Sequence, residues 1–434
     1  MAESAGSTAG APYRGFRAPA LLVFLILLNI LNFIDRILPQ AFIVDIMRDV
    51  GFTYTQFTLI NGPVFGLVYA IAGLGMGVMA DRFHRPRLIA AGLFIWSGLT
   101  AATGLATNFV QMTLARAFVA VGEASLSPSA LSMLSNVFPP KRRGSITSLY
   151  YIGISLGAGG SYVIAGTLGA AIGWRNCFLV LGAIGMVLAL IVAFLPEPRQ
   201  GGGTGRADSA AAPSVRAAAG AGVKVLRHSP SLRWVLIAAT LLLFGQGASI
   251  LDQAWLVKEL GFETGDAQRR FGGLFLIGSL AGALLGGPLA DLFVRRSPAG
   301  RLYYAIAIYA LVVPVSVFLR VMEPSAAFYI GFLVVSAGVT LHYASLLPTV
   351  QELAPLHARA TIIAVTLLVM ALIGSALGNL AAGMLADLYI ARGLERPVTW
   401  AIISINLVSL LALPALYMAA RNYSRDREAH GSLD

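Results

Sequence analysis

Apolar stretches long enough to cross a membrane recur along the whole chain, with short polar segments between them. A helix rises about 1.5 Å per residue, so roughly 20 apolar residues span the hydrocarbon core of a bilayer. The pattern predicts twelve membrane-spanning helices, near residues 18–47, 55–80, 87–107, 109–137, 145–171, 175–195, 230–259, 269–292, 300–321, 325–352, 359–388 and 397–420. The expected fold class is therefore an all-α polytopic membrane protein of twelve transmembrane helices.

One longer polar segment, residues 196–229, divides these spans into two groups of six. It contains three consecutive glycines, many alanines and several basic residues, a composition typical of a flexible linker. The expected organisation is a cytoplasmic N-terminal tail (1–17), a six-helix bundle (18–195), the cytoplasmic linker, a second six-helix bundle (230–420) and a cytoplasmic tail (421–434).

The distribution of basic residues predicts how the chain is oriented. With the N-terminus inside, the inner segments hold 21 of the 31 basic residues and the outer segments hold 8. Cytoplasmic loops carry such an excess of Lys and Arg, so both termini are expected in the cytoplasm. No small-x-small cleavage site follows the first apolar run, which predicts a first span rather than a signal peptide.

Composition excludes several classes of function. The net charge of +11 is dispersed over short loops with no basic face, so nucleic-acid binding is not expected. One cysteine, Cys177, and five scattered histidines make no disulfide and no metal site. The sequence contains no nucleotide-binding loop, zinc-protease motif or nucleophile elbow. We therefore expect neither an enzyme nor a cofactor, and an ion gradient as the energy source.

Four ionisable residues lie at membrane depth, all in the first half: Asp35, Arg36, Arg116 and Glu123. A charge near the middle of a bilayer costs at least about 2.5–3.5 kcal/mol, so each needs a partner. Arg116 and Glu123 are seven residues apart, which places them on one face of a helix. The four charges are expected to form one cluster.

Two segments of the chain repeat. Residues 77–85 and 287–295 both read Gly-x-x-Ala-Asp-x-Phe-x-Arg, after the second and eighth spans. The first copy resembles the signature loop of the major facilitator superfamily of transporters. Arg116 followed by Val-Gly-Glu-Ala at 121–124 resembles that superfamily's helix-four motif. The resemblance implies two pseudo-symmetric six-helix halves around a central cavity lined by helices one and four.

Three shorter motifs are similar to those of the Spinster family: Asn-Phe-Ile-Asp-Arg at 32–36, Gly-Glu-Ala at 122–124 and Lys-Arg-Arg-Gly at 141–144. This resemblance implies export of lysophospholipids or sphingosine-1-phosphate-type lipids. The short, Ala- and Gly-rich chain is typical of a bacterial homologue, in the inner membrane. The Asn-x-x-Asp-Arg pattern also occurs in superfamily members that take up organic anions. Transport of a drug or an organic anion is therefore the alternative function.

The charged cluster suggests proton coupling. Burial raises the pKa of a carboxyl group, and a nearby arginine lowers it. A carboxylate that gains or loses its arginine as the transporter rocks changes its proton affinity. We expect Asp35 and Glu123 to take protons, with Arg36 and Arg116 as partners that tune them. The alternative is a permanent ion-pair network that only holds helices one and four together.

Substrate candidates combine polar side chains with aromatic ones. The second half is expected to hold no matching pair of buried charges, and Asp252 is either a polar cavity residue or solvated near the outer end. The alternative for each aromatic residue is ordinary packing in the helix bundle. The alternative for His342 is a packing residue held by a hydrogen bond. Phe244 and Phe275 are further apolar candidates. The predicted substrate-binding residues are Asn32, Phe33, Phe65, Tyr69, Gln246, Trp255, His342 and Tyr343.

The signature loop implies a gating role for Asp81, Arg82 and Arg85. Asp291 is the second-half counterpart, with Leu292 where the first copy has Arg82. The basic residues of this loop also serve to enforce topology. We expect a monomer, surrounded by membrane lipids, that carries an amphipathic lipid or another small molecule. A lipid-modifying membrane enzyme and a non-transporting receptor are the alternatives from other classes.

Overall fold

The computed structural model describes residues 17–198, 225–355 and 358–431. The predicted N-terminal tail and most of the predicted linker lie outside the described residues. Within the described part, twelve helical segments are long and apolar enough to cross a membrane. The predicted fold class is confirmed. The third and fourth spans are joined by a tight hairpin, because one helix ends at Leu105 and the next begins at Phe109.

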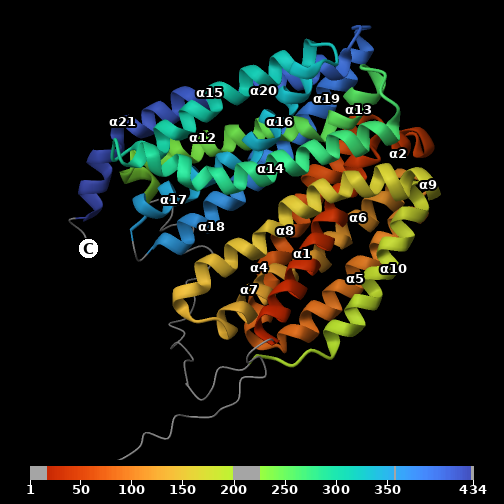
Figure 1. Cartoon of the computed structure of the whole chain (residues 1–434), viewed down its shortest axis with the longest axis horizontal. Coiled ribbons are helices and arrows are strands. Elements are labelled where there is room, and N and C mark those ends of the chain that lie inside the picture. The colour runs from red at the N-terminus through yellow and green to blue at the C-terminus, as the bar shows by residue number, and fades with distance from the viewer. Residues whose placement is uncertain (1–16, 199–224, 356–357, 432–434) are drawn as a thin grey trace, which may run out of the picture.

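The spans of the first half form one bundle, coloured red to yellow in Figure 1. They are α1 (Arg17–Ala41), α3 (Tyr54–Leu59) with α4 (Phe65–Arg82), α5 (Arg85–Leu105), α6 (Phe109–Glu123) with α7 (Leu126–Val137), α8 (Arg143–Ile164) with α9 (Ala170–Ile172), and α10 (Trp174–Ala193). Short π-helical segments, Ile60–Val64 and Ala165–Gly169, join the two parts of the second and fifth spans.

The spans of the second half form the other bundle, coloured green to blue. They are α12 (Pro230–Gln246) with α13 (Asp252–Lys258), α14 (Thr264–Val294), α15 (Gly300–Val321), α16 (Ala326–Leu341) with α17 (Tyr343–Leu353), α18 (Arg359–Val369) with α19 (Leu377–Ala391), and α20 (Pro397–Ser409) with α21 (Ala412–Gly431). A 3₁₀ segment, Gly247–Leu251, interrupts the seventh span, and a π-helical segment, Met370–Ala376, interrupts the eleventh.

Two span boundaries differ from the prediction. The first span was expected over 18–47, but α1 ends at Ala41 and a separate helix, α2 (Ile43–Val50), follows. The charged side chains of Asp45 and Arg48 on α2 form an ion pair of 3.3 Å, which favours the membrane surface over its interior. The last span was expected to end near 420, whereas α21 continues to Gly431.

The extension of α21 packs against the second bundle. The carboxylate of Asp426 accepts hydrogen bonds from the Ser231 backbone N–H at 2.7 Å and the Ser229 hydroxyl at 3.0 Å, at the first turn of α12. The Tyr423 hydroxyl donates to the Glu352 carboxylate of α17 at 2.7 Å. These contacts explain why a sequence segment with little hydrophobicity remains helical.

The two bundles approach each other at the end of the molecule that carries α2, α9 and α13, and diverge at the end that carries α7, α17 and α18 (Figure 1). We call these the closed end and the open end. Gln268 of α14 donates to the Ala41 carbonyl at 2.7 Å, and Arg269 to the Gly166 carbonyl at 3.4 Å. All hydrogen bonds between the halves that the described residues make lie at the closed end.

The Asp387 carboxylate of α19 makes two of these hydrogen bonds. It accepts hydrogen bonds from the backbone N–H groups of Tyr54, at 3.0 Å, and Thr55, at 2.8 Å. These groups belong to the first turn of α3, where no intrahelical partner exists for them and the helix dipole favours an anion. Asp387 therefore caps a helix of the opposite half and holds the closed end together.

The Asp387→Ala substitution is expected to weaken the closed end. Loss of a helix cap costs about 1–2 kcal/mol, which changes the ratio of two states by a factor of about 5–30. Spin labels are placed at the exposed positions of Arg48 and Arg392 in a Cys177→Ala background. Double electron–electron resonance should then show a larger fraction of molecules with a longer distance between the two labels.

Glu259→Ala is the matched control. The Glu259 carboxylate caps α20 through the Val398 and Thr399 N–H groups, at 2.7 and 2.8 Å, within one half. Its loss should reduce thermal stability without lengthening the distance between the labels. An unchanged distance distribution in Asp387→Ala would contradict the assigned role.

Candidate functional site

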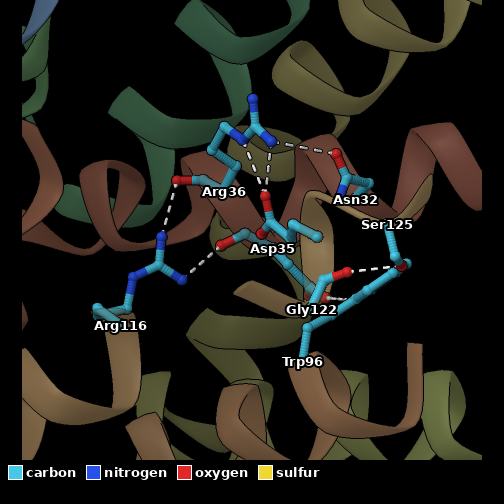
Figure 2. A network of polar contacts seen from close by, with 8 residues as sticks. Asn32, Asp35, Arg36, Trp96, Arg116, Gly122 and Ser125 are labelled. Carbon is cyan, nitrogen blue, oxygen red and sulfur yellow. Dashed lines mark hydrogen bonds and ion pairs between the residues drawn. The ribbon is translucent and has the colours of Figure 1, made fainter. Parts of the chain in front are cut away.

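An ion pair joins α1 to α6 in the interior of the first bundle. Both Nε and Nη2 of Arg36 donate to Oε2 of Glu123, at 2.9 and 2.7 Å, and Nη2 also reaches Oδ1 of Asn32 at 3.5 Å (Figure 2). The Glu123 side chain is fully buried, whereas the Arg36 side chain is 22% exposed. The pair therefore combines a sequestered carboxylate with a guanidinium that remains accessible.

Arg116 makes a different set of contacts from those of Arg36. Its Nη1 donates to the backbone carbonyl of Asp35 at 3.2 Å and its Nη2 to that of Arg36 at 3.4 Å (Figure 2). Pro39 lies inside α1, and a proline has no N–H for the carbonyl four residues earlier. That carbonyl belongs to Asp35. Arg116 thus supplies the hydrogen bond that Pro39 removes, and the spacing of Asp35 and Pro39 is the sequence signal for it.

Asp35 is completely buried and receives a hydrogen bond from outside the predicted cluster. Its Oδ2 accepts from the Trp96 indole N–H of α5 at 3.1 Å, while Oδ1 has no partner among the described residues. Gly122 makes this arrangement possible, because a Cβ there would lie 2.8 Å from the Trp96 Cβ. Sequence reasoning missed Trp96, since nothing in a single apolar span marks one tryptophan as a carboxylate partner.

Aromatic rings surround the accessible guanidinium. The Arg36 Cζ lies 4.8 Å from the Phe33 ring centroid, 5.3 Å from that of Phe65 and 4.6 Å from that of Tyr69. The Phe65 and Tyr69 rings are stacked, with centroids 6.0 Å apart. Three predicted substrate residues are therefore brought together with the predicted coupling residues, in a site that offers one cation and a large apolar wall.

The second half contains a small cavity of about 100 Å³, lined among others by Gln246, Asp252 and His342. It also contains a buried ion pair, which corrects our expectation that this half has none. Arg320 Nη2 donates to Asp252 Oδ1 at 2.8 Å, and the Arg320 side chain is only 3% exposed. Arg320 lies in the last turn of the ninth span, where a basic residue usually faces the membrane surface, so its inward direction was not anticipated.

The other predicted substrate residues of this half have different positions. Trp255 is fully buried, with its ring 4.2 Å from the Arg320 guanidinium carbon and 5.8 Å from the Phe328 ring. It does not line the cavity. Tyr343 is 38% exposed and lies beside His342, with 4.5 Å between the ring centroids.

The residues predicted to act as a gate lie at the open end. Asp81, Arg82 and Asp291 are exposed, and their side chains make no hydrogen bond or ion pair within the described chain. Arg85 Nε donates to the Ala80 carbonyl at 3.3 Å. In this conformation it is Asp387, at the closed end, that caps a helix of the other half.

The role assigned to Arg116 predicts a specific non-additivity. In a Pro39→Ala background the new N–H bonds the Asp35 carbonyl, so Arg116→Ala should cost less stability than in the wild type. The expected coupling energy is about 1 kcal/mol, measured as free energy of unfolding in mixed micelles.

Pro314 lies inside α15, away from Arg116, and supplies the control. Pro314→Ala and Arg116→Ala should have additive effects. Additivity between Pro39→Ala and Arg116→Ala as well would show that Arg116 does not act through this carbonyl.

Comparison with known proteins agrees with the geometry. Residues 25–379 match the family model of the Major Facilitator Superfamily. An MFS-type efflux pump of Mycolicibacterium smegmatis is 29% identical over 417 residues, 94% of each chain. The sphingosine-1-phosphate transporter SPNS2 of Mus musculus is 29% identical over 177 residues, which are 40% of this chain and 32% of that one.

Among solved structures, the fold is similar to that of a bacterial homolog of the human lysosomal transporter Spinster, in an inward-facing and unoccupied conformation. The TM-score is 0.82 at 22% identity, over 96% of this chain and 98% of the other. The buried charges, the twelve spans and the family match together lead to one conclusion: the chain belongs to the major facilitator superfamily and is a multi-pass integral membrane protein, a secondary transporter of small molecules and not an enzyme.

Proposed function

We propose that this protein transports an amphipathic molecule by proton-coupled alternating access, and that its substrate is a lipid of the lysophospholipid or sphingosine-1-phosphate type. One observation carries the proposal: the Arg36–Glu123 ion pair lies beside a second buried carboxylate, Asp35, and within a set of aromatic rings. The site combines two proton acceptors with a surface suited to a charged headgroup and an apolar chain.

The coupling argument rests on the difference between the two carboxylates. Glu123 is paired with Arg36, whereas Asp35 accepts a hydrogen bond from the Trp96 N–H and its other oxygen has no hydrogen-bond partner among the described residues. In an apolar interior a carboxyl group without a cation favours the protonated form, and an adjacent arginine favours the ionised form. Because Arg36 remains accessible, loss of its contact with Glu123 as the transporter rocks would leave that carboxylate ready to accept a proton.

The arrangement of the two halves indicates which side of the membrane the open end faces. The hydrogen bonds between the halves close the end that carries Asp387, and the basic loops 82–87 and 141–143 lie at the open end. Basic loops mark the cytoplasmic side. We therefore assign the open end to the cytoplasm, with both termini there, in the inner membrane of a bacterium. The exposed Asp81 and Asp291 loops are then free to join when the transporter opens outward.

The second candidate is proton-coupled drug efflux. It is favoured by the similarity, over 94% of both chains, to a protein named as an MFS-type efflux pump. A cationic drug would stack on Phe33, Phe65 and Tyr69 after Arg36 moves. The lipid proposal is preferred because the accessible charge at the site is cationic, which repels a cationic drug and attracts a phosphate or carboxylate.

Proteoliposomes test the coupling. Asp35→Asn and Glu123→Gln should each reduce accumulation driven by a pH gradient by at least about tenfold, because the carried proton loses its acceptor, while counterflow without a gradient persists. Glu323→Gln, at an exposed position, is the control and should behave as wild type. Gradient-driven transport that persists in both variants, at normal folded yield, would contradict the coupling proposal.

The substrate class is tested by the aromatic wall. Tyr69→Ala should weaken lysolipid binding roughly tenfold, because a cation–π contact is lost and apolar area is uncovered. Tyr417→Ala, at an exposed position on α21, should leave the affinity unchanged. Uptake of fluorescent lysolipid, compared with that of a cationic dye, distinguishes the two candidates, since transport of the dye alone favours drug efflux.

A further inference from the structure

Arg320 uses few of the hydrogen bonds that a guanidinium can make. Of its five N–H donors, one on Nη2 bonds Asp252, while Nε and Nη1 have no partner among the described residues. The side chain is 3% exposed and lines the small cavity of the second half. Buried donors without partners are costly, so a donor set of this kind is expected to serve a ligand.

The position of Arg320 is rigidly determined. Its guanidinium carbon lies 4.2 Å from the centroid of the Trp255 ring, and Trp255 is itself fully buried against Phe328. Arg396 of α20 donates to the Arg320 carbonyl at 3.3 Å. Packing on one face and the Asp252 bond on one edge hold the guanidinium in place, which leaves its other edge available for planar recognition of an oxyanion.

His342 supplies a second group with an unused atom. Its Nδ1 lies 2.8 Å from the Gly338 carbonyl, which can only accept, so this nitrogen carries the proton. In the neutral ring Nε2 is then an acceptor, and it has no partner within the described part of the chain. Arg320 and His342 both line the cavity, so its walls include residues with unused donors, suited to an anionic oxygen, and an unused acceptor, suited to a hydroxyl. A singly protonated phosphate monoester carries both of these groups.

The size of the cavity limits what it can hold. Its volume is about 100 Å³, and one water occupies about 30 Å³ of the liquid. The space fits a headgroup of phosphate size and not an acyl chain. Phe275, which lines the cavity, contacts Tyr162 of the first half with ring centroids 6.3 Å apart, so the cavity lies beside the boundary between the bundles.

We propose that this cavity is an oxyanion subsite, in which the phosphate or carboxylate of the substrate headgroup replaces Asp252 as the partner of Arg320. The inference rests on the proposed transport of an amphipathic molecule and adds the chemistry of its headgroup. A phosphate monoester is the better fit, because it offers oxygens to Arg320 and a hydroxyl to His342. Asp252 acts as an internal substitute for the anion while the subsite is empty.

Equilibrium binding to the purified full-length protein tests the subsite. Three ligands with the same acyl chain are compared: a lysophosphatidate, a fatty acid and an uncharged monoacylglycerol. The wild type should bind the phosphate at least about tenfold more tightly than the uncharged ligand, with the carboxylate between them. Arg320→Gln should reduce the phosphate affinity to that of the uncharged ligand and leave the latter unchanged. Arg392→Gln, at an exposed position, is the matched control.

Asp252→Asn separates this proposal from a purely structural ion pair. If the carboxylate competes with the ligand, its removal should increase phosphate affinity about five- to tenfold. A structural pair predicts equal or weaker binding. Because a single substitution leaves one buried charge unpaired, the double variant Asp252→Asn/Arg320→Gln, which is neutral at this position, is measured as well. It should fold and show no preference for the anion.

The outcomes also distinguish this inference from the proposed function. Wild-type protein that binds all three ligands equally, or a preference for phosphate that survives in the double variant, overturns the oxyanion subsite and leaves amphipath transport standing. Wild-type protein that binds none of the three ligands overturns the proposed substrate class and the subsite together.

Discussion

The cost of placing charge in an apolar interior governs the structure of this transporter. Every ionised side chain at membrane depth must be paired, hydrogen-bonded or accessible to a polar cavity, because the hydrocarbon offers no compensation. Arg36 and Glu123 meet this requirement by pairing, and Asp252 and Arg320 do so in the other half. Each pair connects two spans of one bundle, so the same contacts that neutralise charge also determine which helices are neighbours.

The backbone imposes the same requirement as the side chains. A proline within a membrane helix leaves a carbonyl without its donor, and in a bilayer water cannot replace it. Arg116 donates to the Asp35 carbonyl that Pro39 leaves without a donor, so this buried arginine bonds the backbone and forms no ion pair within the described residues. The two arginines therefore have different functions. Arg116 is buried and donates to two backbone carbonyls of α1, while Arg36, with a partly exposed side chain, remains the arginine that can change partners.

The connection between the halves depends on the same physics at the membrane surface. Asp387 of one half neutralises the unsatisfied N–H groups at the start of α3 in the other half. Such a bond is strong enough to define a closed end, yet it is a contact between two surfaces and not part of either core. Alternating access requires contacts of this kind, which are specific in one state and can be separated without unfolding a bundle.

The sequence by itself determined the elements of this protein. Apolar length and short polar breaks predicted the twelve spans, and the resemblance implied two halves, because these features depend on local composition. It also identified Asp35, Arg36, Arg116 and Glu123, since charges inside apolar runs are conspicuous. The ends of the first and last spans were less well predicted, because surface helices such as α2 and the end of α21 are stabilised by contacts that periodicity does not show.

Only the tertiary structure decided which atoms meet. Arg36 and Glu123 are 87 positions apart in the chain, Trp96 and Asp35 are 61 apart, and Arg320 and Asp252 are 68 apart. Partners at such separations are set by how helices pack, through close approaches such as that at Gly122, and a single sequence carries no direct record of packing. The charges were therefore predictable, whereas their partners depended on the fold.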